Sequence, residues 1–361
     1  MLLELACGDA YGACFECTKD FITEENNILK YTAHPRLRGA KGTYDPVPTC
    51  KYTDDTQMSI ASVEIMLEIP EFFKRKKRPW EDQADVTERE IAHMDLAHVG
   101  KVIEVLADKY VSVFKRDERK GYTVYLLNVL LNSENGRELL SKLNGKSTKS
   151  GAFMRAAPFG FYEDVKDVIA AADMQAQVTH DSWIGRHTSV GAALMTHYLY
   201  RNLGPKDEMV EWMKGLPSHT IYNWPYDDRE VCNFENLHGD EAFEIDGEVV
   251  RPWKPGRRVR VHGWDCLESA IYAIENNDNM ADILKECVSH GGDVDTNSAV
   301  AMAAASCSGE IEQNLPSNLI QNLENGTFGH DFLVELDQKF QEAFPCTSSF
   351  TGTGTAETGT D

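Results

Sequence analysis

Apolar residues recur at the three- and four-residue spacing of an α-helix through most of this chain, and this pattern constrains the fold more than any other feature. The clearest case is residues 56–69 (TQMSIASVEIMLEI), which Pro70 follows as a helix stop. Residues 296–306 (TNSAVAMAAAS) are rich in small side chains, so we expect a central helix that packs closely on its neighbours. Further helices are predicted at residues 96–114, 122–131, 165–179, 188–199, 266–275 and 280–287.

Three segments depart from this helical pattern. Residues 72–90 are dense in charge and include a basic run at 74–78, which favours a solvated loop over a nucleic-acid patch. The stretch 205–261 mixes Pro, Gly, Trp and charge, and its residues 242–250 predict a small hairpin around an Asp-Gly turn. The low-complexity tail 347–361 is predicted to be disordered.

Composition narrows the class of protein. The net charge of −22 argues against DNA or RNA as a partner, because phosphate backbones are bound by basic patches. An acidic chain suits a solvated surface, a basic protein partner or a metal-rich site. There is no apolar run long enough for a membrane helix, and residues 1–5 lack the basic region of a signal peptide. Nine scattered cysteines indicate a reduced, cytoplasmic protein, and the Cys14–Cys17 pair lacks the partners of a zinc or redox site.

The first candidate site is Thr53-Asp54-Asp55-Thr56, directly before the helix predicted at 56–69. An interpretation without chemistry is a helix N-cap, since Thr and Asp cap helices and acidic residues favour the helix N-terminus. Taken alone, this cluster favours the helix-cap interpretation over a functional site.

The second candidate is Gly291-Gly292-Asp293-Val294-Asp295-Thr296, which also precedes a predicted helix. The two glycines allow a tight turn, and Asp293 and Asp295 can point into one concavity. The spacing does not match an EF-hand calcium loop, because the later acidic positions are missing.

The two clusters together predict more than either alone, provided that they meet in space. Two like charges about 4 Å apart cost roughly 4 kcal/mol at an effective dielectric near 20, so four converging aspartates repel strongly. Two divalent cations cancel that repulsion, and ligands that are all oxygen favour hard ions such as Mg²⁺ or Mn²⁺.

Three further segments carry weaker signals. Residues 8–16 (GDAYGACFE) predict either a close helix–helix crossing or a loop near a ligand. Residues 150–158 (SGAFMRAAP) can offer backbone N–H groups to a phosphate or a ribose. His180, between Thr179 and Asp181, is by itself more typical of a structural or surface histidine.

The set GDAYGACFE, YTDDTQMS, SGAFMRAAP, TH and GGDVDT resembles the ADP-ribosylglycohydrolase family in its order along the chain. That family includes the dinitrogenase-reductase-activating glycohydrolase and the ADP-ribosylarginine hydrolases. The resemblance spans about residues 8–309, and TDDT paired with GDxDT is a specific combination.

The resemblance implies a compact, single-domain, all-α fold over residues 1–346, with a small irregular or hairpin insertion at about 205–261. It also implies two Mg²⁺ or Mn²⁺ ions held by residues of both clusters, namely Thr53, Asp54, Asp55, Asp293, Asp295 and Thr296. Glu16 and Asp55 are the catalytic candidates, with Glu16 first as general acid or base.

The substrate contacts that the resemblance implies are Ser150, Gly151, Ala152, Met154, Arg155, His180 and Trp264. The loop 150–155 matches the segment that contacts the diphosphate and the ribose nearest the cleaved bond. His180 matches a residue near the adenosine end, and Trp264 stands where the family usually has a tyrosine. A shortened first helix, Ser150 in place of a frequent Asn and the long 205–261 stretch are departures from the family, and the last two bear on substrate preference.

The activity that follows is hydrolysis of the N-glycosidic bond between ADP-ribose and an arginine of a modified protein. The wider family also handles serine and O-acetyl-ADP-ribose, and arginine is expected on resemblance alone. Asp117 is a weaker candidate for a catalytic carboxylate, for which a surface charge is the favoured interpretation. Two alternatives stay open: an immunity protein that binds an ADP-ribosyltransferase toxin, and a relative without activity that serves a structural role.

Overall fold

The structure is a computed structural model that describes residues 1–16, 26, 29–31, 34–38, 44–47, 50–70, 88–216, 233–245 and 247–346. Three predictions lie outside the described residues: the basic run 74–78, the disordered tail 347–361, and the second cysteine of the Cys14–Cys17 pair.

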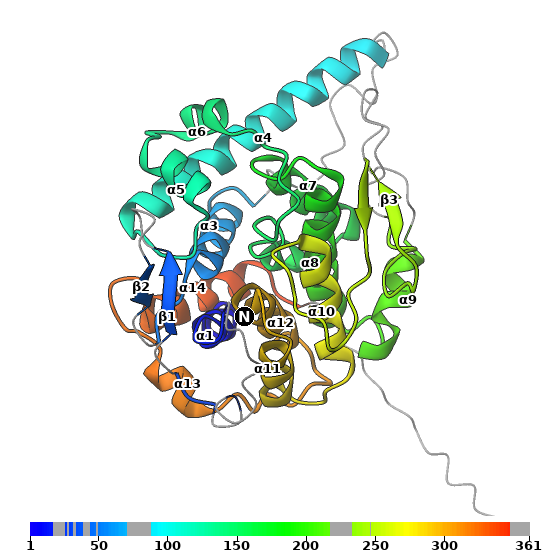
Figure 1. Cartoon of the computed structure of the whole chain (residues 1–361). Helices are drawn as coiled ribbons and strands as arrows, with labels where there is room; N and C mark the ends of the chain where they lie inside the picture. Colours follow the sequence, from blue (N-terminus) through cyan, green and yellow to red (C-terminus); the bar gives the residue numbers. More distant parts are fainter. Residues whose placement is uncertain are drawn as a thin grey trace, which may run out of the picture.

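The described chain is mostly helical, as the apolar spacing predicted, and two short hairpins complete it (Figure 1). The helices of the first half are α1 (Leu2–Gly12), α3 (Asp54–Glu68), α4 (Glu88–Arg116), α5 (Val124–Leu131), α6 (Gly136–Lys142) and α7 (Val165–Gln177). Those of the second half are α8 (Trp183–Tyr200), α9 (Met209–Lys214), α10 (Gly263–Glu275), α11 (Met280–Ser289), α12 (Val294–Ala305), α13 (Ser317–Asn322) and α14 (His330–Ala343). Short 3₁₀ helices lie at Ala157–Phe161 and Lys206–Glu208.

The hairpins are β1 (His34–Arg38) with β2 (Tyr44–Val47), and β3 (Phe243–Ile245) with β4 (Glu248–Val250). Both pairs are antiparallel. The second confirms the hairpin predicted at 242–250, while the apolar pattern gave no sign of the first.

Helices α1 and α12 cross at the centre of the molecule (Figure 1). A Cβ atom added to Gly8 would lie 2.5 Å from the carbonyl oxygen of Ser298, and one added to Gly12 would lie 2.5 Å from the Cα atom of Asp295. Any larger residue at these two positions would push the helices apart. The close helix crossing predicted for residues 8–16 is therefore confirmed, and it brings the end of α1 against the start of α12.

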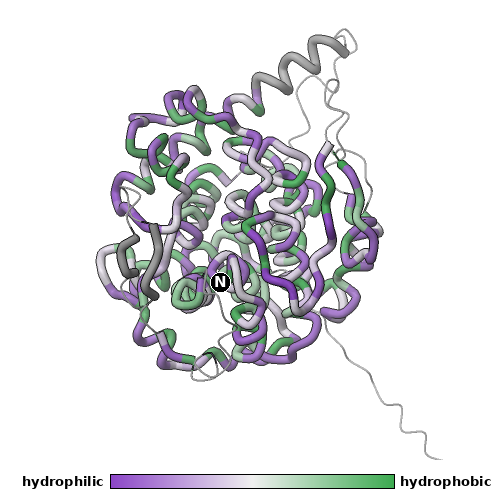
Figure 2. The backbone as a smooth tube through the Cα atoms, in the orientation of Figure 1, coloured by the Kyte–Doolittle hydropathy of each residue, from purple (hydrophilic) through white to green (hydrophobic). Residues whose placement is uncertain are grey.

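The apolar core surrounds this crossing. Every residue of α12 is buried, and its small side chains allow neighbouring helices to pack against each of its faces. Figure 2 shows hydrophobic segments along the central helices and hydrophilic ones on the peripheral loops. Side-chain caps fix where surrounding helices begin: Asp164 accepts from the backbone N–H of Lys166 before α7, and Ser182 accepts from that of Gly185 before α8.

Helix α4 differs from its prediction. It begins at Glu88 rather than residue 96, so the end of the segment interpreted as a charged loop at 72–90 is helical. The first turns are rich in charge and poor in regularly spaced apolar residues, which hides them from a periodicity argument. Among the described residues, no helix is both long and apolar enough to span a membrane.

Candidate functional site

A cavity of about 460 Å³, here called the carboxylate cavity, brings most of the predicted site together. Its lining comes from segments far apart in the sequence and includes Glu16, Asp54, Asp55, Ser150, Gly151, Met154, Thr179, His180, Asp293, Asp295 and Thr296. The two aspartate clusters therefore meet in space, which was the condition for expecting metal ions.

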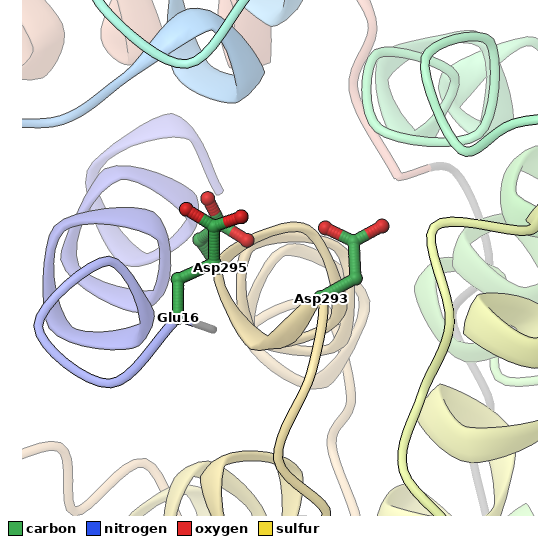
Figure 3. A group of neighbouring side chains, drawn as sticks. All are labelled: Glu16, Asp293 and Asp295. Atoms are coloured by element: carbon green, nitrogen blue, oxygen red, sulfur yellow. The ribbon is translucent and has the colours of Figure 1, made fainter. Parts of the chain in front are cut away.

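Glu16 reaches this cavity because α1 approaches α12 so closely. The carboxylates of Glu16, Asp293 and Asp295 each offer an oxygen, and these three oxygens lie within 4.8 Å of one another. Figure 3 shows all three side chains extending to the same side of the helix ends. Such spacing lets one cation contact more than one carboxylate.

Asp9 holds the Thr53–Thr56 segment in place. Its carboxylate accepts hydrogen bonds from the backbone N–H groups of Thr53 (2.8 Å) and Thr56 (3.0 Å). It also accepts from the hydroxyls of Thr53 (2.8 Å) and Thr56 (2.6 Å). The sequence argument missed this role, although an aspartate inside an otherwise apolar helix was the available signal.

These contacts also exclude the simple helix-cap interpretation of the two clusters. Neither Thr53 before α3 nor Asp293 before α12 makes a side-chain cap hydrogen bond. The Thr53 hydroxyl instead lies between Asp9 and Asp55, at 2.8 and 3.2 Å from their carboxylate oxygens. The Thr53 side chain is thus directed toward the carboxylates of Asp9 and Asp55 rather than toward the end of its own helix.

Backbone contacts fix the second cluster. Gly292 has a φ of +97°, and a Cβ atom there would overlap the carbonyl oxygen of Val259. The N–H of Asp293 donates to that same carbonyl at 2.9 Å. One carboxylate oxygen of Asp293 accepts from the Ser150 hydroxyl at 2.7 Å and lies 3.5 Å from the Cys266 sulfur. Ser150 therefore orients Asp293 and also lines the cavity.

The electrostatics of the carboxylate cavity favour the binding of cations by its carboxylates. Burial, followed by the charges of neighbouring carboxylates, raises the pKa values of Asp54, Asp55 and Asp295 well above their usual range. Oδ1 of Asp55 and Oδ1 of Asp295 are buried without a hydrogen-bond partner in the described part of the chain. Buried like charges with open oxygens are stable when cations bind them, so the residues present fit a hard divalent metal.

Four predicted site residues lie outside the lining of the carboxylate cavity. Ala152 and Arg155 are buried behind its wall, and Trp264 is buried between Trp183 and Phe243, with ring centroids 5.6 and 5.2 Å away. These three residues do not line the carboxylate cavity, and their roles as substrate contacts stay predictions. Thr53 is turned toward Asp9, and its role as a metal ligand stays a prediction.

Some residues of the 150–155 loop line the cavity and others do not, and the cause is the local backbone turn. The N–H of Met154 donates to the carbonyl of Ser150 at 3.0 Å, which closes one helical turn. Positions 150, 151 and 154 therefore share the face that lines the cavity, while Ala152 and Arg155 point to the opposite side.

Asp117 also lies away from the carboxylate cavity. It pairs with Arg119, whose Nε lies 2.7 Å from the Asp117 carboxylate, in a separate cavity next to Tyr52 and Glu324. This ion pair supports the interpretation of Asp117 as a structural or surface charge.

Comparisons with known proteins show the family of the chain. A model of the family described as ADP-ribosylglycohydrolase matches residues 1–346. The chain is 25% identical to ADP-ribosylhydrolase ARH3 of Xenopus tropicalis over 96% of this chain and 97% of that protein. It is 24% identical to ADP-ribosylhydrolase ARH3 of Mus musculus over 93% and 90% of the two chains. A solved structure titled ADP-ribosylglycohydrolase-related protein complex has the same fold, with a TM-score of 0.57 at 17% identity and 96% coverage of both chains.

Proposed function

Because the chain belongs to the ADP-ribosylglycohydrolase family, we propose that this hydrolase removes ADP-ribose from modified protein side chains with two divalent ions, Mg²⁺ or Mn²⁺. The observation that carries the proposal is the convergence of the two aspartate clusters, with open carboxylate oxygens, in one cavity. The ligands proposed for the ions are those of the resemblance: Thr53, Asp54, Asp55, Asp293, Asp295 and Thr296.

The ions, when bound, supply positive charge and Lewis acidity at this site. Glu16 then serves as the general acid or base, since its carboxylate sits at the cavity wall beside Asp295. Asp55 is the second candidate for proton transfer. Positive character builds on the ribose as the glycosidic bond breaks, and these carboxylates stabilise it.

Binding of the ADP-ribosyl group is assigned to the rest of the wall. Ser150, Gly151 and Met154 form one face of a helical turn along the cavity, and His180 lies beside them. The wall thus offers backbone groups, one hydroxyl and one imidazole near the carboxylates. We propose that this side holds the diphosphate and adenosine parts of the substrate.

The proposed acceptor is arginine, on the resemblance of the motif set. The names of the matched relatives state no acceptor residue. Peptides that carry ADP-ribose on arginine or on serine separate the possibilities, with released ADP-ribose measured in Mg²⁺ and in Mn²⁺. Release from the serine peptide alone would replace the arginine proposal, and release from neither would overturn the hydrolase proposal for protein substrates.

The immunity-protein alternative rests on the net charge of −22, which suits a basic toxin surface. A variant without its metal site distinguishes the two roles in cells that express an ADP-ribosyltransferase. Protection that survives in the variant favours direct binding, whereas loss of protection favours hydrolysis. The cytoplasmic location expected from the scattered cysteines stays a prediction.

A further inference from the structure

A buried polar network lies directly behind the wall of the carboxylate cavity. The guanidinium of Arg155 is 1% exposed and lies 4.5 Å from the ring centroid of Tyr110. Its Nε donates to the side-chain oxygen of Gln175 at 2.7 Å, and one terminal nitrogen donates to the Thr179 hydroxyl at 2.7 Å. The hydroxyl in turn lies 2.6 Å from Nδ1 of His180. The network therefore connects a fixed cation to a cavity residue.

The direction of the protons follows from what each group can donate. Arginine has only donors, so the Thr179 oxygen accepts from Arg155. Threonine has a single hydroxyl proton, and within the described residues Nδ1 of His180 is the one acceptor found for it. The reverse arrangement, with Nδ1 donating, would leave a buried hydroxyl proton without a partner, at a cost of roughly 1–3 kcal/mol. His180 therefore accepts at Nδ1 and carries its proton on Nε2.

The second ring nitrogen of His180 lies beside another residue of the cavity lining. A Cβ atom added to Gly151 would lie 2.8 Å from Cε1 and 3.1 Å from Nε2, so this edge of the ring packs on another lining residue. Burial lowers the pKa of His180 well below its usual value, and the charges of Arg155 and Lys149 lower it further. The imidazole is thus neutral at physiological pH, although several carboxylates share the cavity.

We propose that Thr179 and Arg155 are positioning residues that fix His180 as the neutral Nε2–H tautomer, which donates a hydrogen bond to the bound ADP-ribosyl group. The identity of this ligand rests on the proposed function, whereas the tautomer does not. A neutral donor selects an oxygen or nitrogen acceptor without adding a charge beside the metal site. Arg155 contributes from behind the wall, which explains why a residue predicted to contact substrate is buried.

The tautomer is tested first, by long-range ¹H–¹⁵N correlation spectra of protein labelled with ¹⁵N-histidine. The His180 signals are assigned from their absence in His180→Gln. We expect Nε2–H in the wild type and in Thr179→Ser, which keeps the hydroxyl. Thr179→Val removes it while keeping the shape, so we expect a mixture of tautomers. An Nδ1–H tautomer or an imidazolium in the wild type would overturn the proposal, whether or not the protein binds ADP-ribose.

The effect of the tautomer on affinity for ADP-ribose is tested by titrating ADP-ribose into the metal-loaded protein in a calorimeter. We expect Thr179→Val to raise Kd about tenfold and Thr179→Ser to stay within about twofold of the wild type. Thr196→Val is the matched control, because Thr196 is also buried but its hydroxyl bonds to Ala192 of its own helix at 3.0 Å. Equal Kd values for Thr179→Val and the control would overturn the positioning role.

The two proposals fail in distinguishable ways. A wild-type protein that shows the Nε2–H tautomer but neither binds ADP-ribose nor releases it from peptides contradicts the proposed function. The positioning of His180 by Thr179 and Arg155 would still hold. A wild-type protein that hydrolyses its substrate with the Nδ1–H tautomer contradicts only the positioning of His180.

Discussion

Two cavities are lined by neighbouring residues of the segment that carries Thr53 and Asp54. The carboxylate cavity, described above, takes Asp54 in its lining, whereas Thr53 lines a second cavity of about 410 Å³. The second one is here called the ion-pair cavity, and its lining includes Lys51, Tyr52, Arg116, Asp117, Arg119 and Glu324. Both linings contain acidic and basic side chains, and the carboxylate cavity includes Lys146 and Lys149, so the comparison concerns which carboxylates have a cationic partner.

The ion-pair cavity balances its own charges. Arg119 donates to both Asp117 and Glu324, and its guanidinium lies 3.8 Å from the ring centroid of Tyr52. Asp117 and Glu324 therefore have a cationic partner from the same chain. In the carboxylate cavity Glu16 lies near the aspartates, and Oδ1 of Asp55 and Oδ1 of Asp295 have no hydrogen-bond partner among the residues that the structure describes. Arg119 thus balances the acidic pair of the ion-pair cavity, whereas no ion pair to Asp54, Asp55, Asp293 or Asp295 is found among the described residues, and we expect these aspartates to need added cations.

The largest effect is expected from Asp295→Ala in the carboxylate cavity. Turnover should fall more than about 10³-fold, because both the ion site and its alignment are lost. The metal-free variant should be no less stable than the metal-free wild type, since one of several repelling charges is gone. Hydrolysis assays and thermal melts with and without Mn²⁺ measure both, and EDTA should reproduce the loss of turnover in the wild type.

Glu324→Ala is the matched control from the ion-pair cavity. It should lower the melting temperature in both metal states and leave turnover and the Mn²⁺-induced rise in melting temperature intact. A large loss of activity in this control, or full activity in Asp295→Ala, would remove the distinction between the cavities.

Glu16→Gln should reduce kcat about 100-fold or more, the usual contribution of a general acid or base. The amide keeps the shape of the side chain but cannot exchange a proton at neutral pH. The Mn²⁺-induced rise in melting temperature separates this role from metal binding. If the rise disappears in Glu16→Gln, then Glu16 is a metal ligand rather than the proton-transfer group.

Asp9→Asn tests the residue that supports the cavity from behind. One acceptor oxygen becomes an NH₂ group that faces the donors of Thr53 and Thr56, so we expect a loss of about 3 kcal/mol in the free energy of unfolding. Denaturant titration measures it. Because Asp9 also aligns the first metal cluster, metal affinity should weaken as well. An unchanged unfolding free energy would show that Asp9 does not hold the segment.

Local patterns in the sequence predicted much of the fold but not its packing. Regular apolar spacing and Pro70 predicted α3 within two residues of each end. The two aspartate clusters were recognised as a pair, yet only the crossing at Gly8 and Gly12 explains how Glu16 joins them. Contacts between distant segments depend on packing that no local pattern encodes.

The same limit applies to the predicted site residues that do not line the carboxylate cavity. Arg155 stands beside lining residues in the sequence, but one helical turn directs it behind the wall. Trp264 lies within α10, and the face of that helix on which it stands packs on Trp183. A motif gives the order of residues along the chain, whereas the face that each one presents is decided by the backbone turn and by neighbouring helices.

Arg119→Met tests the ion-pair cavity with a smaller effect. Asp117 and Glu324 would lose a shared cation at a mostly buried position, and we expect a loss of about 2 kcal/mol in the free energy of unfolding. Metal affinity should not change, since no proposed ligand contacts Arg119. Denaturant and Mn²⁺ titrations give the two values, and a weakened metal site would mean that the cavities are coupled through their common segment.

A lone buried carboxylate sharpens the comparison further. Glu268 has neither a metal site nor an arginine partner among the described contacts, and accepts from the backbone N–H groups of His238 and Trp253. Burial raises its pKa from 4.5 to about 7. Between these values the folded state holds a proton that the unfolded state releases, so stability is full below about pH 4.5 and declines as pH rises toward 7.

The expected contribution to this slope is about 1 kcal/mol per pH unit between pH 5 and 7. Glu268→Gln should flatten it, because an amide does not titrate, and urea unfolding at several pH values measures the difference. The same slope in the variant and the wild type would assign the pH dependence to other groups. Two N–H donors would then suffice to keep a single buried carboxylate charged, and the need for cations in the carboxylate cavity would follow from the crowding of its charges rather than from burial.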